Sequence, residues 1–453
     1  MNLRKTITTD TIWLGFMIFS FYLGAGNIIF PPLAGYLAGE HVWITMGGFL
    51  LTAVGLPLLG LLAIANNRTS TTTGSIASLT RFLPGSMATG LMILLYIIMG
   101  PAFALPRTAL VAYEMGLKPW LTTDSDVILV GYSLLFFILV SGCALCRSAL
   151  IDNIGKYLTP LLTLTLLLLG LAVFLAPQGE LTSATSQYLD APFSKGIIDG
   201  YNTMDALASL MFGSLIISLL EQRGSNARGQ SRQLAFAGIM AAAGLTLVYF
   251  FLFKLGNTAA GIPLPDVHGA AIVIAYVDSL FGPPGTLVLA LIITLACFTT
   301  AVGLLSACSD FFHSISGLSH PHCTLINAIL CLLVANTGLT QLIDISIPFL
   351  LAIYPVIISL IFLNLLQNYL PNKPLCFRAV TFVALLFGSL DGLAAAGVPM
   401  AFMNAMPLYT VGLAWVIPTL CTMLITLPVP ARAGKNSAEN QQDNNDKMPT
   451  SYQ

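Results

Sequence analysis

The chain has 453 residues, of which 56% are hydrophobic and 8% are charged, and its formal net charge is −1 at pH 7. Soluble domains carry about 25% charged residues, so this composition predicts a protein that crosses a membrane many times. The near-zero charge argues against a nucleic acid partner, and the eight cysteines lie almost entirely in apolar stretches, which argues against a disulfide framework.

An α-helix needs about 20 apolar residues to cross the hydrocarbon core of a bilayer. By this criterion we expect an all-α protein with twelve transmembrane helices in a transmembrane domain of residues 1–430. The polar residues 431–453 lack periodicity and are expected to form a disordered cytoplasmic tail. The expected spans are 11–37, 41–65, 85–115, 126–146, 151–176, 198–221, 231–257, 284–313, 321–337, 343–370, 375–396 and 406–428.

The positions of the basic residues predict the orientation of the chain. If the N-terminus is cytoplasmic, fourteen of the 18 Lys and Arg residues lie on the cytoplasmic side, and only Lys118 and Lys195 lie outside. Cytoplasmic connections of membrane proteins collect basic residues, so we expect both termini in the cytoplasm. On the outer side, residues 266–281 are expected to form a helix on the membrane surface, either a lid or a packed connector.

The first span contains a strong helix-breaking pattern. Gly24–Asn27 interrupts its apolar run, and Pro31 and Pro32 follow. Glycine is a poor helix former and proline lacks the amide that bonds one turn back, so this span should unwind locally. Bare peptide groups are costly in hydrocarbon, which indicates that a bound solute and cation satisfy them. Close helix packing explains the glycines alone, but not Asn27 with the prolines.

A second interruption is expected in the sixth span, where Asp199–Gly213 begins with several polar residues. Two broken spans at matching places in two halves are typical of inverted-repeat transporters. The repeats would cover about 11–176 and 198–370, and the last two helices, 375–428, would be additional.

The ends of half-helices suit a charged solute. The N-terminal end presents unpaired amides and about half a positive charge, which favours a carboxylate, whereas the opposite end presents carbonyls that favour Na⁺. This pattern predicts a zwitterionic amino acid with a co-transported cation. Asp205 is an acid inside a span, and such acids usually face a cavity or a partner. It would receive the substrate ammonium or help to hold the cation; alternatively, the span begins later and Asp205 lies in an outer vestibule.

Four motifs together resemble the bacterial branched-chain amino acid:cation symporter family (BrnQ type) of the amino acid–polyamine–cation superfamily. They are Gly24–Pro32 followed by Ala38–Trp43, then Gly100–Ala109, Gly200–Leu207 and Leu295–Gly303. The likeness covers the whole chain except the tail. It implies Na⁺-driven import of leucine, isoleucine and valine across a bacterial inner membrane. It also implies a leucine-transporter-like 5+5 inverted repeat with discontinuous helices 1 and 6.

The resemblance also implies roles for individual residues. The amides of Ala25 and Gly26 would meet the substrate carboxylate, and two threonines of the eighth span would complete a sodium site. Alternatively, the two hydroxyls have no ligand role and bond to backbone carbonyls of the preceding turn of the same helix, as hydroxyls in membrane helices often do. The expected substrate-binding residues are Gly24, Ala25, Gly26, Asn27 and Asp205. The expected Na⁺ ligands are Tyr22, Leu23, Asn27, Thr299 and Thr300.

Arg107 and Glu114 lie seven residues apart in the third span, hence on one face of a continuous helix. We expect them to form a structural or gating pair, and direct contact of Arg107 with the substrate is the second interpretation.

Two alternatives remain open at this point. A proton could replace Na⁺, with Asp205 as its main carrier. A membrane-embedded enzyme would need a nucleophile–base or metal constellation, but no span carries two His residues or a His–carboxylate pair at depth. We therefore expect a transporter rather than an enzyme, with Na⁺ as coupling ion and without an organic cofactor. Its partners would be the amino acid and the lipid bilayer, and the sequence sets no oligomeric state.

Overall fold

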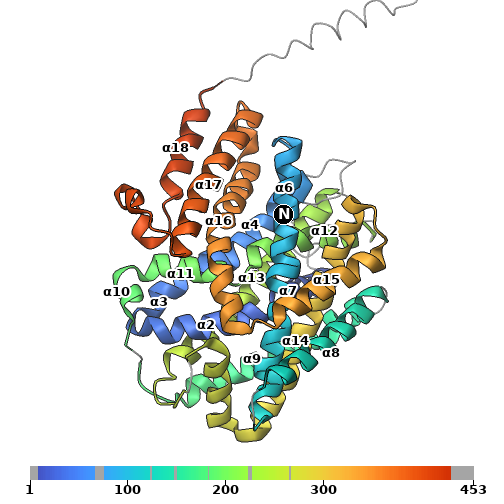
Figure 1. Cartoon of the computed structure of the whole chain (residues 1–453), viewed down its shortest axis with the longest axis vertical. Coiled ribbons are helices and arrows are strands. Elements are labelled where there is room, and N and C mark those ends of the chain that lie inside the picture. The colour runs from blue at the N-terminus through green and yellow to red at the C-terminus, as the bar shows by residue number, and fades with distance from the viewer. Residues whose placement is uncertain are drawn as a thin grey trace, which may run out of the picture.

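The structure, a computed structural model, describes residues 9–66, 76–122, 125–146, 150–181, 183–222, 227–264 and 267–429. Within these ranges every regular element is a helix, so the all-α expectation is confirmed there (Figure 1). The expected tail at 431–453 lies outside the described residues.

The helices are named in chain order. The α-helices are α1 (Thr9–Tyr22), α2 (Ala25–Ala38), α3 (Val42–Leu50), α4 (Leu56–Asn66), α5 (Ile76–Thr80), α6 (Gly85–Ile97), α7 (Ala104–Ala112), α8 (Asp126–Leu145), α9 (Leu150–Leu175), α10 (Ser186–Asp190), α11 (Pro192–Tyr201), α12 (Asp205–Gln222), α13 (Ala227–Asn257), α14 (Gly269–Ser316), α15 (His320–Ala335), α16 (Leu339–Leu365), α17 (Lys373–Ala395) and α18 (Val416–Thr426). Short π-helical turns are η3 (Leu51–Gly55), η4 (Ile98–Ala102) and η5 (Tyr113–Leu117). Short 3₁₀ turns are η2 (Gly39–His41), η6 (Lys118–Trp120), η7 (Gln367–Tyr369), η8 (Ala401–Ala405) and η9 (Tyr409–Val411).

The described residues contain seven helical stretches long and apolar enough to cross a membrane, and four shorter apolar helices. Aliphatic side chains cover the outside: Ile138 and Leu139 of α8 and Leu164 and Leu168 of α9 are all more than half exposed. Exposed aliphatic surface of this kind suits lipid rather than water. The protein is therefore a multi-pass membrane protein, whereas the count of twelve spans stays a prediction.

The first helix is discontinuous, as predicted. α1 ends at Tyr22, Leu23 and Gly24 lie outside any helix, and α2 begins at Ala25. The break is narrower than the sequence pattern suggested, because both Pro31 and Pro32 lie inside α2. Proline holds φ at a helical value and removes only one amide donor, so the helix can run through it.

The sixth span is also broken, but it begins earlier than expected. α11 starts at Pro192 instead of residue 198, and Asn202–Met204 separates it from α12. Met204 has a positive φ of 61°, a conformation that L-residues rarely adopt. The helix is therefore interrupted here without a glycine or proline in the break.

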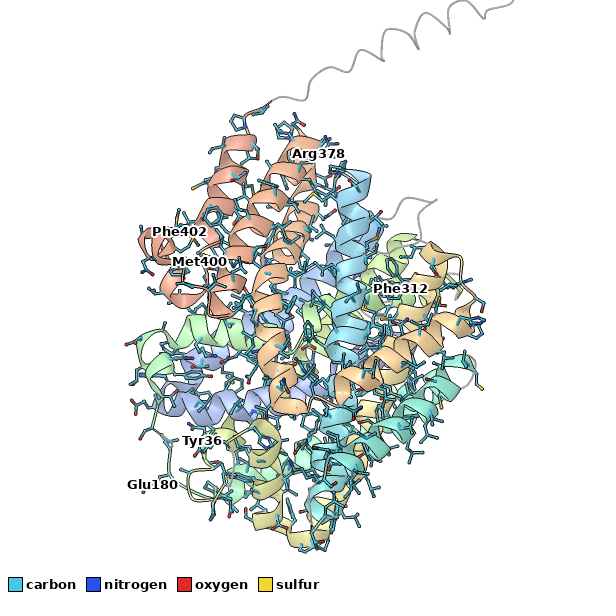
Figure 2. All side chains as sticks on the ribbon, viewed as in Figure 1. Tyr36, Glu180, Phe312, Arg378, Met400 and Phe402 are labelled. Carbon is cyan, nitrogen blue, oxygen red and sulfur yellow. The ribbon has the colours of Figure 1, made fainter. Side chains whose placement is uncertain are left out.

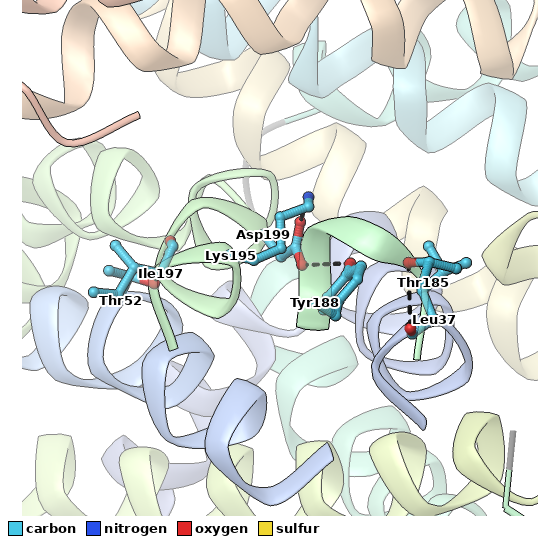
Figure 3. A network of polar contacts seen from close by, with 7 residues as sticks. All are labelled: Leu37, Thr52, Thr185, Tyr188, Lys195, Ile197 and Asp199. Carbon is cyan, nitrogen blue, oxygen red and sulfur yellow. Dashed lines mark hydrogen bonds and ion pairs between the residues drawn. The ribbon is translucent and has the colours of Figure 1, made fainter. Parts of the chain in front are cut away.

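A polar network holds the half-helix α11 in place (Figure 3). The hydroxyl of Tyr188 donates to Asp199 Oδ2 over 2.8 Å, and Lys195 Nζ lies 2.5 Å from Asp199 Oδ1. Thr52 of the η3 turn donates to the carbonyl of Ile197 over 3.0 Å. Burial beside Asp199 raises the pKa of Tyr188 well above its usual range, so this hydroxyl remains a donor.

Two other spans differ from a plain helix. α14 includes the helix expected within residues 266–281, which starts at Gly269, and it kinks at Gly282, whose φ is +62°. The position of this helix on the membrane surface stays a prediction. The expected last span, 406–428, is wrong in its first part: the helix covers only Val416–Thr426. Leu408 and Gly412 both have positive φ, which ends a helix on either side of η9.

α2 lies deep in the molecule because it has close neighbours on two sides. A Cβ at Gly35 would collide with the backbone of Phe253 in α13, and one at Gly269 of α14 would collide with the carbonyl of Ile29. Glycine thus lets both helices reach the backbone of α2. α17 packs against both α16 and α18 at one end of the molecule (Figure 1), which is also where Figure 2 labels Arg378.

Candidate functional site

A cavity lies where the two helix breaks meet. It offers about 40 Å³ of free volume, and it is lined by both breaks together with α7 and α14. A water molecule needs roughly 10–15 Å³ of such volume, so in this conformation the cavity has room for a few water molecules and must widen to admit a larger solute. Gly26 brings the breaks together, because a Cβ there would come within 3.3 Å of the carbonyl oxygen of Asn202.

The polar wall of the cavity is a buried hydrogen-bond network. Asn27 Nδ2 donates to Asp205 Oδ2 over 2.6 Å and also to the hydroxyl of Tyr249. Tyr249 donates to the same Asp205 oxygen over 2.8 Å. Asp205 is the first residue of α12 and is only 2% exposed, so it lies inside the protein and not in an outer vestibule.

Tyr249 was not predicted from the sequence as a residue of the site. It lies in α13 within the apolar run from Val248 to Leu252, where nothing distinguishes it from a residue that packs in the core. Its hydroxyl closes a network between α2, α12 and α13, so its role becomes visible only in the folded chain.

The break in the first helix presents its peptide groups to the cavity. Gly24, Ala25, Gly26 and Asn27 all line it. The side chain of Asn27 accepts from the amide of Gly24 over 3.2 Å, and the amide of Asn27 donates to the carbonyl of Gly24. The first amides of a helix lack intrahelical acceptors, which leaves Ala25 and Gly26 as donors toward a bound anion.

The hydroxyls of the two adjacent threonines of α14 have different environments. Thr300 lines the cavity beside Gly24, and its hydroxyl is buried without a hydrogen-bond partner among the described residues. The hydroxyl of Thr299 instead donates to the carbonyl of Ala296 over 2.9 Å, the back-bonded arrangement. Of the other expected cation ligands, Tyr22 lines the cavity, whereas Leu23 lies in the break but not among the lining residues.

The expected pair of Arg107 and Glu114 does not form. Arg107 Nη1 donates to the carbonyl of Asn202 over 2.6 Å, and Glu114 pairs with Lys118 at 3.0 Å. Seven residues advance a helix by about 10 Å, so a shared face does not bring these side chains together. Arg107 lines the cavity, and its direct contact with a substrate stays a prediction.

The remaining wall of the cavity is apolar. The rings of Phe21 and Phe212 stack with centroids 4.8 Å apart, and Met99, Ala208 and Leu304 complete the lining. The cavity wall therefore combines an apolar surface with the polar groups described above, as ligand sites of proteins usually do.

Sequence comparison finds one family along nearly the whole chain: the family described as "Branched-chain amino acid transport protein" matches residues 7–432. The branched-chain amino acid transport system 2 carrier protein of Pseudomonas aeruginosa is 44% identical over 431 residues, covering 94% of this chain and 97% of the relative. The branched-chain amino acid permease BrnQ of Escherichia coli is 40% identical over 430 residues, with the same coverage. The permease BraB of Bacillus subtilis is 39% identical over 427 residues, covering 92% of this chain and 94% of the relative.

Structural comparison finds transporters of similar fold. The inward-facing conformation of Mhp1 gives a TM-score of 0.57 at 13% identity, covering 96% of this chain and 95% of Mhp1. MhsT in complex with L-phenylalanine gives 0.53 at 16% identity, covering 91% of this chain and 97% of MhsT. At these identities the likeness concerns the fold alone.

Proposed function

Since the chain belongs to the family of branched-chain amino acid transport proteins, we propose that it imports leucine, isoleucine and valine together with Na⁺ by alternating access. It is a transport protein and not an enzyme. We further propose that it works in a bacterial inner membrane with both termini in the cytoplasm.

The observation that carries this proposal is the meeting of two helix breaks at one cavity. The carboxylate of the amino acid would bind the amides of Ala25 and Gly26 at the positive end of α2. Its ammonium would approach Asp205, and its branched side chain would pack against Phe21 and Phe212.

Na⁺ would bind on the other side of the first break. The carbonyls of Tyr22 and Leu23 lie at the negative end of α1, and the unpartnered hydroxyl of Thr300 lies beside Gly24. The side chain of Asn27 would contribute through the polar network. Oxygen ligands suit hard cations, and none of these groups titrates, which favours Na⁺ over a proton.

The test is leucine uptake into proteoliposomes that contain the purified protein, with inward Na⁺ and H⁺ gradients imposed separately. We expect the Na⁺ gradient to drive accumulation and the H⁺ gradient alone to leave it at the equilibrium level. Accumulation driven only by the H⁺ gradient would overturn Na⁺ coupling, and absence of leucine transport under both gradients would overturn the proposed function.

One observation favours proton coupling as the second candidate. Asp205 is a buried carboxylate in the cavity wall, and the two side chains that donate hydrogen bonds to it, Asn27 and Tyr249, are both neutral. Such a group can carry a proton across the transport cycle. In that case Asp205→Asn would abolish accumulation driven by a pH gradient, while counterflow of labelled leucine would persist. If the variant accumulates leucine normally at every pH, Asp205 carries no coupling proton.

A further inference from the structure

Arg107 is a buried cation in the wall of the cavity without an acidic partner among the described residues. It is only 2% exposed. Its Nη1 donates to the carbonyl of Asn202 over 2.6 Å and its Nη2 to Ser346 Oγ over 3.2 Å. Its Cζ lies 5.1 Å from the ring centroid of Phe30. The remaining nitrogen, Nε, is buried and has no acceptor.

These contacts compensate only part of the positive charge. The carbonyl of Asn202 follows the last turn of α11, where the helix dipole supplies about half a negative charge. Ser346 is neutral, and an aromatic ring contributes a weak attraction. A charge inside a membrane protein is costly when it lacks a partner, so the site of Arg107 favours binding of an anion, which the described residues do not provide.

Asp205 is not this anion, although it lines the same cavity. Its carboxylate accepts from Asn27 and Tyr249, and no ion pair joins it to Arg107. The cavity therefore holds one positive and one negative group that do not neutralise each other. A zwitterion presents the complementary pair of charges.

We propose that Arg107 binds the carboxylate of the transported amino acid through its unused Nε–H, alongside the amides of α2. This rests on the proposed function and adds a side chain to the substrate site. The planar guanidinium fork matches a carboxylate, and an ion pair of this kind is among the stronger polar contacts. Asn202 and Ser346 hold the guanidinium in place for it, so the fork is oriented before the substrate arrives.

The test compares leucine with leucinamide, which keeps the ammonium and the side chain but lacks the negative charge. Apparent affinities are measured with the full-length protein in detergent, in Na⁺ buffer, from the ligand-induced shift of the unfolding midpoint. We expect Arg107→Gln to weaken leucine binding by about 30-fold or more, the range for losing one partner of a buried charge pair. Leucinamide affinity should change by less than about 3-fold, because its neutral amide leaves no ion pair to lose.

Arg107→Lys is the second variant, since it keeps the charge and loses the fork, and it should give an intermediate loss for leucine. Arg81→Gln is the matched control: Arg81 bonds Gln367 and lies over Phe82, away from the cavity, so it should not change the ratio of the two affinities.

If Arg107→Gln leaves the ratio of the leucine and leucinamide affinities unchanged, whether both are weakened equally or neither changes, the assignment is overturned and Arg107 is only a structural link. If Arg107→Gln does not fold, Arg107→Lys decides in the same way, because an unchanged ratio there also overturns it. Failure of the unaltered protein to bind leucine would instead refute the proposed function.

Discussion

Asp205 receives hydrogen bonds from two neutral side chains of other helices, so neutral polar groups and not a cation contact its buried carboxyl group. Thr300 shows the opposite situation, a buried hydroxyl that has no partner among the described residues. Near the first helix break, the carboxyl group of Asp205 thus has its hydrogen bonds satisfied by the protein, whereas the hydroxyl of Thr300 lacks a partner and is available to a bound ligand.

At the residue scale, Thr300→Ala should raise the Na⁺ concentration that half-saturates leucine uptake by roughly tenfold, which corresponds to one lost ligand of about 1.4 kcal/mol. Thr300→Ser keeps the hydroxyl and should stay near the original value. Thr299→Ala serves as the matched control, since that hydroxyl bonds to Ala296, and its effect should be much smaller. Uptake rates at a series of Na⁺ concentrations measure this. A larger effect at Thr299 than at Thr300 would contradict the assignment.

The Tyr188 hydroxyl gives a prediction about pH. Tyr188→Phe removes the donor to Asp199 and should lower stability by about 1–3 kcal/mol, the range for a hydrogen bond to a charged group. The folded pKa of Tyr188 is raised, so its contribution is complete below the unfolded value of about 10 and is lost as the pH rises through the folded value.

Thermal unfolding of both proteins in detergent measures this difference. It should be constant between about pH 6 and pH 9 and shrink only above about pH 10. A difference that disappears at neutral pH would show that Tyr188 does not hold Asp199 by this bond.

At the scale of elements, the two breaks work as a unit because their backbones touch. The contact depends on Gly26, which leaves room for Asn202 and Thr203 at the start of the second break. The other end of α2 has its own link: the amide of Thr185 donates to the carbonyl of Leu37 over 3.0 Å, close to the Tyr188 network (Figure 3). α2 is thus tied to the second break at Gly26 and, at its other end, to the residues that precede α11.

Gly26→Ala tests this contact. The added Cβ would lie 3.3 Å from the carbonyl oxygen of Asn202, which is tighter than most real contacts, and should separate the two breaks. We expect a loss of about 1–3 kcal/mol in stability, as for other overpacked sites, and a clear drop in leucine uptake. Gly85→Ala is the matched control, because a Cβ there meets nothing within 4 Å. Thermal unfolding and uptake are measured together, and equal behaviour of the two variants would contradict the close contact.

At the scale of the whole molecule, the family, the fold likeness and the apolar exterior agree on a transporter that crosses the membrane several times. Figure 2 labels Arg378 toward one end of the long axis and Tyr36 and Glu180 toward the other. The orientation predicted from the basic residues places Arg378 in the cytoplasm and Glu180 outside, which is compatible with that separation.

Cysteine labelling checks this orientation. Cys143, Cys146 and Cys421, which are not buried, are first replaced by Ser. In intact cells, Lys118→Cys should react with a membrane-impermeant maleimide, whereas Arg378→Cys should react only after the membrane is opened. The reverse pattern would invert the topology, and reaction of both from outside would mean that the number of spans between them is wrong.

The sequence by itself determined the features that depend on local chemistry. Gly24 and its neighbours are poor helix formers, so the first break was predictable from the sequence. The polar residues at the start of the sixth span predicted the second break. The same pattern overestimated the part played by Pro31 and Pro32, because whether a helix runs through a proline depends on its surroundings. The likeness to a transporter family was also readable, since it is carried by contiguous motifs.

Only the tertiary structure decided which side chains meet. Asn27 and Asp205 are 178 positions apart, and Tyr249 is another 44 positions beyond, so no local pattern relates them. The rotation of α14 leaves the hydroxyl of Thr300, and not that of Thr299, facing the cavity without a partner. Helix packing likewise gives Arg107 the carbonyl of Asn202 as its partner instead of Glu114. Backbone preference is set by neighbours in sequence, whereas a binding site is set by neighbours in space, and these arise only when distant helices pack.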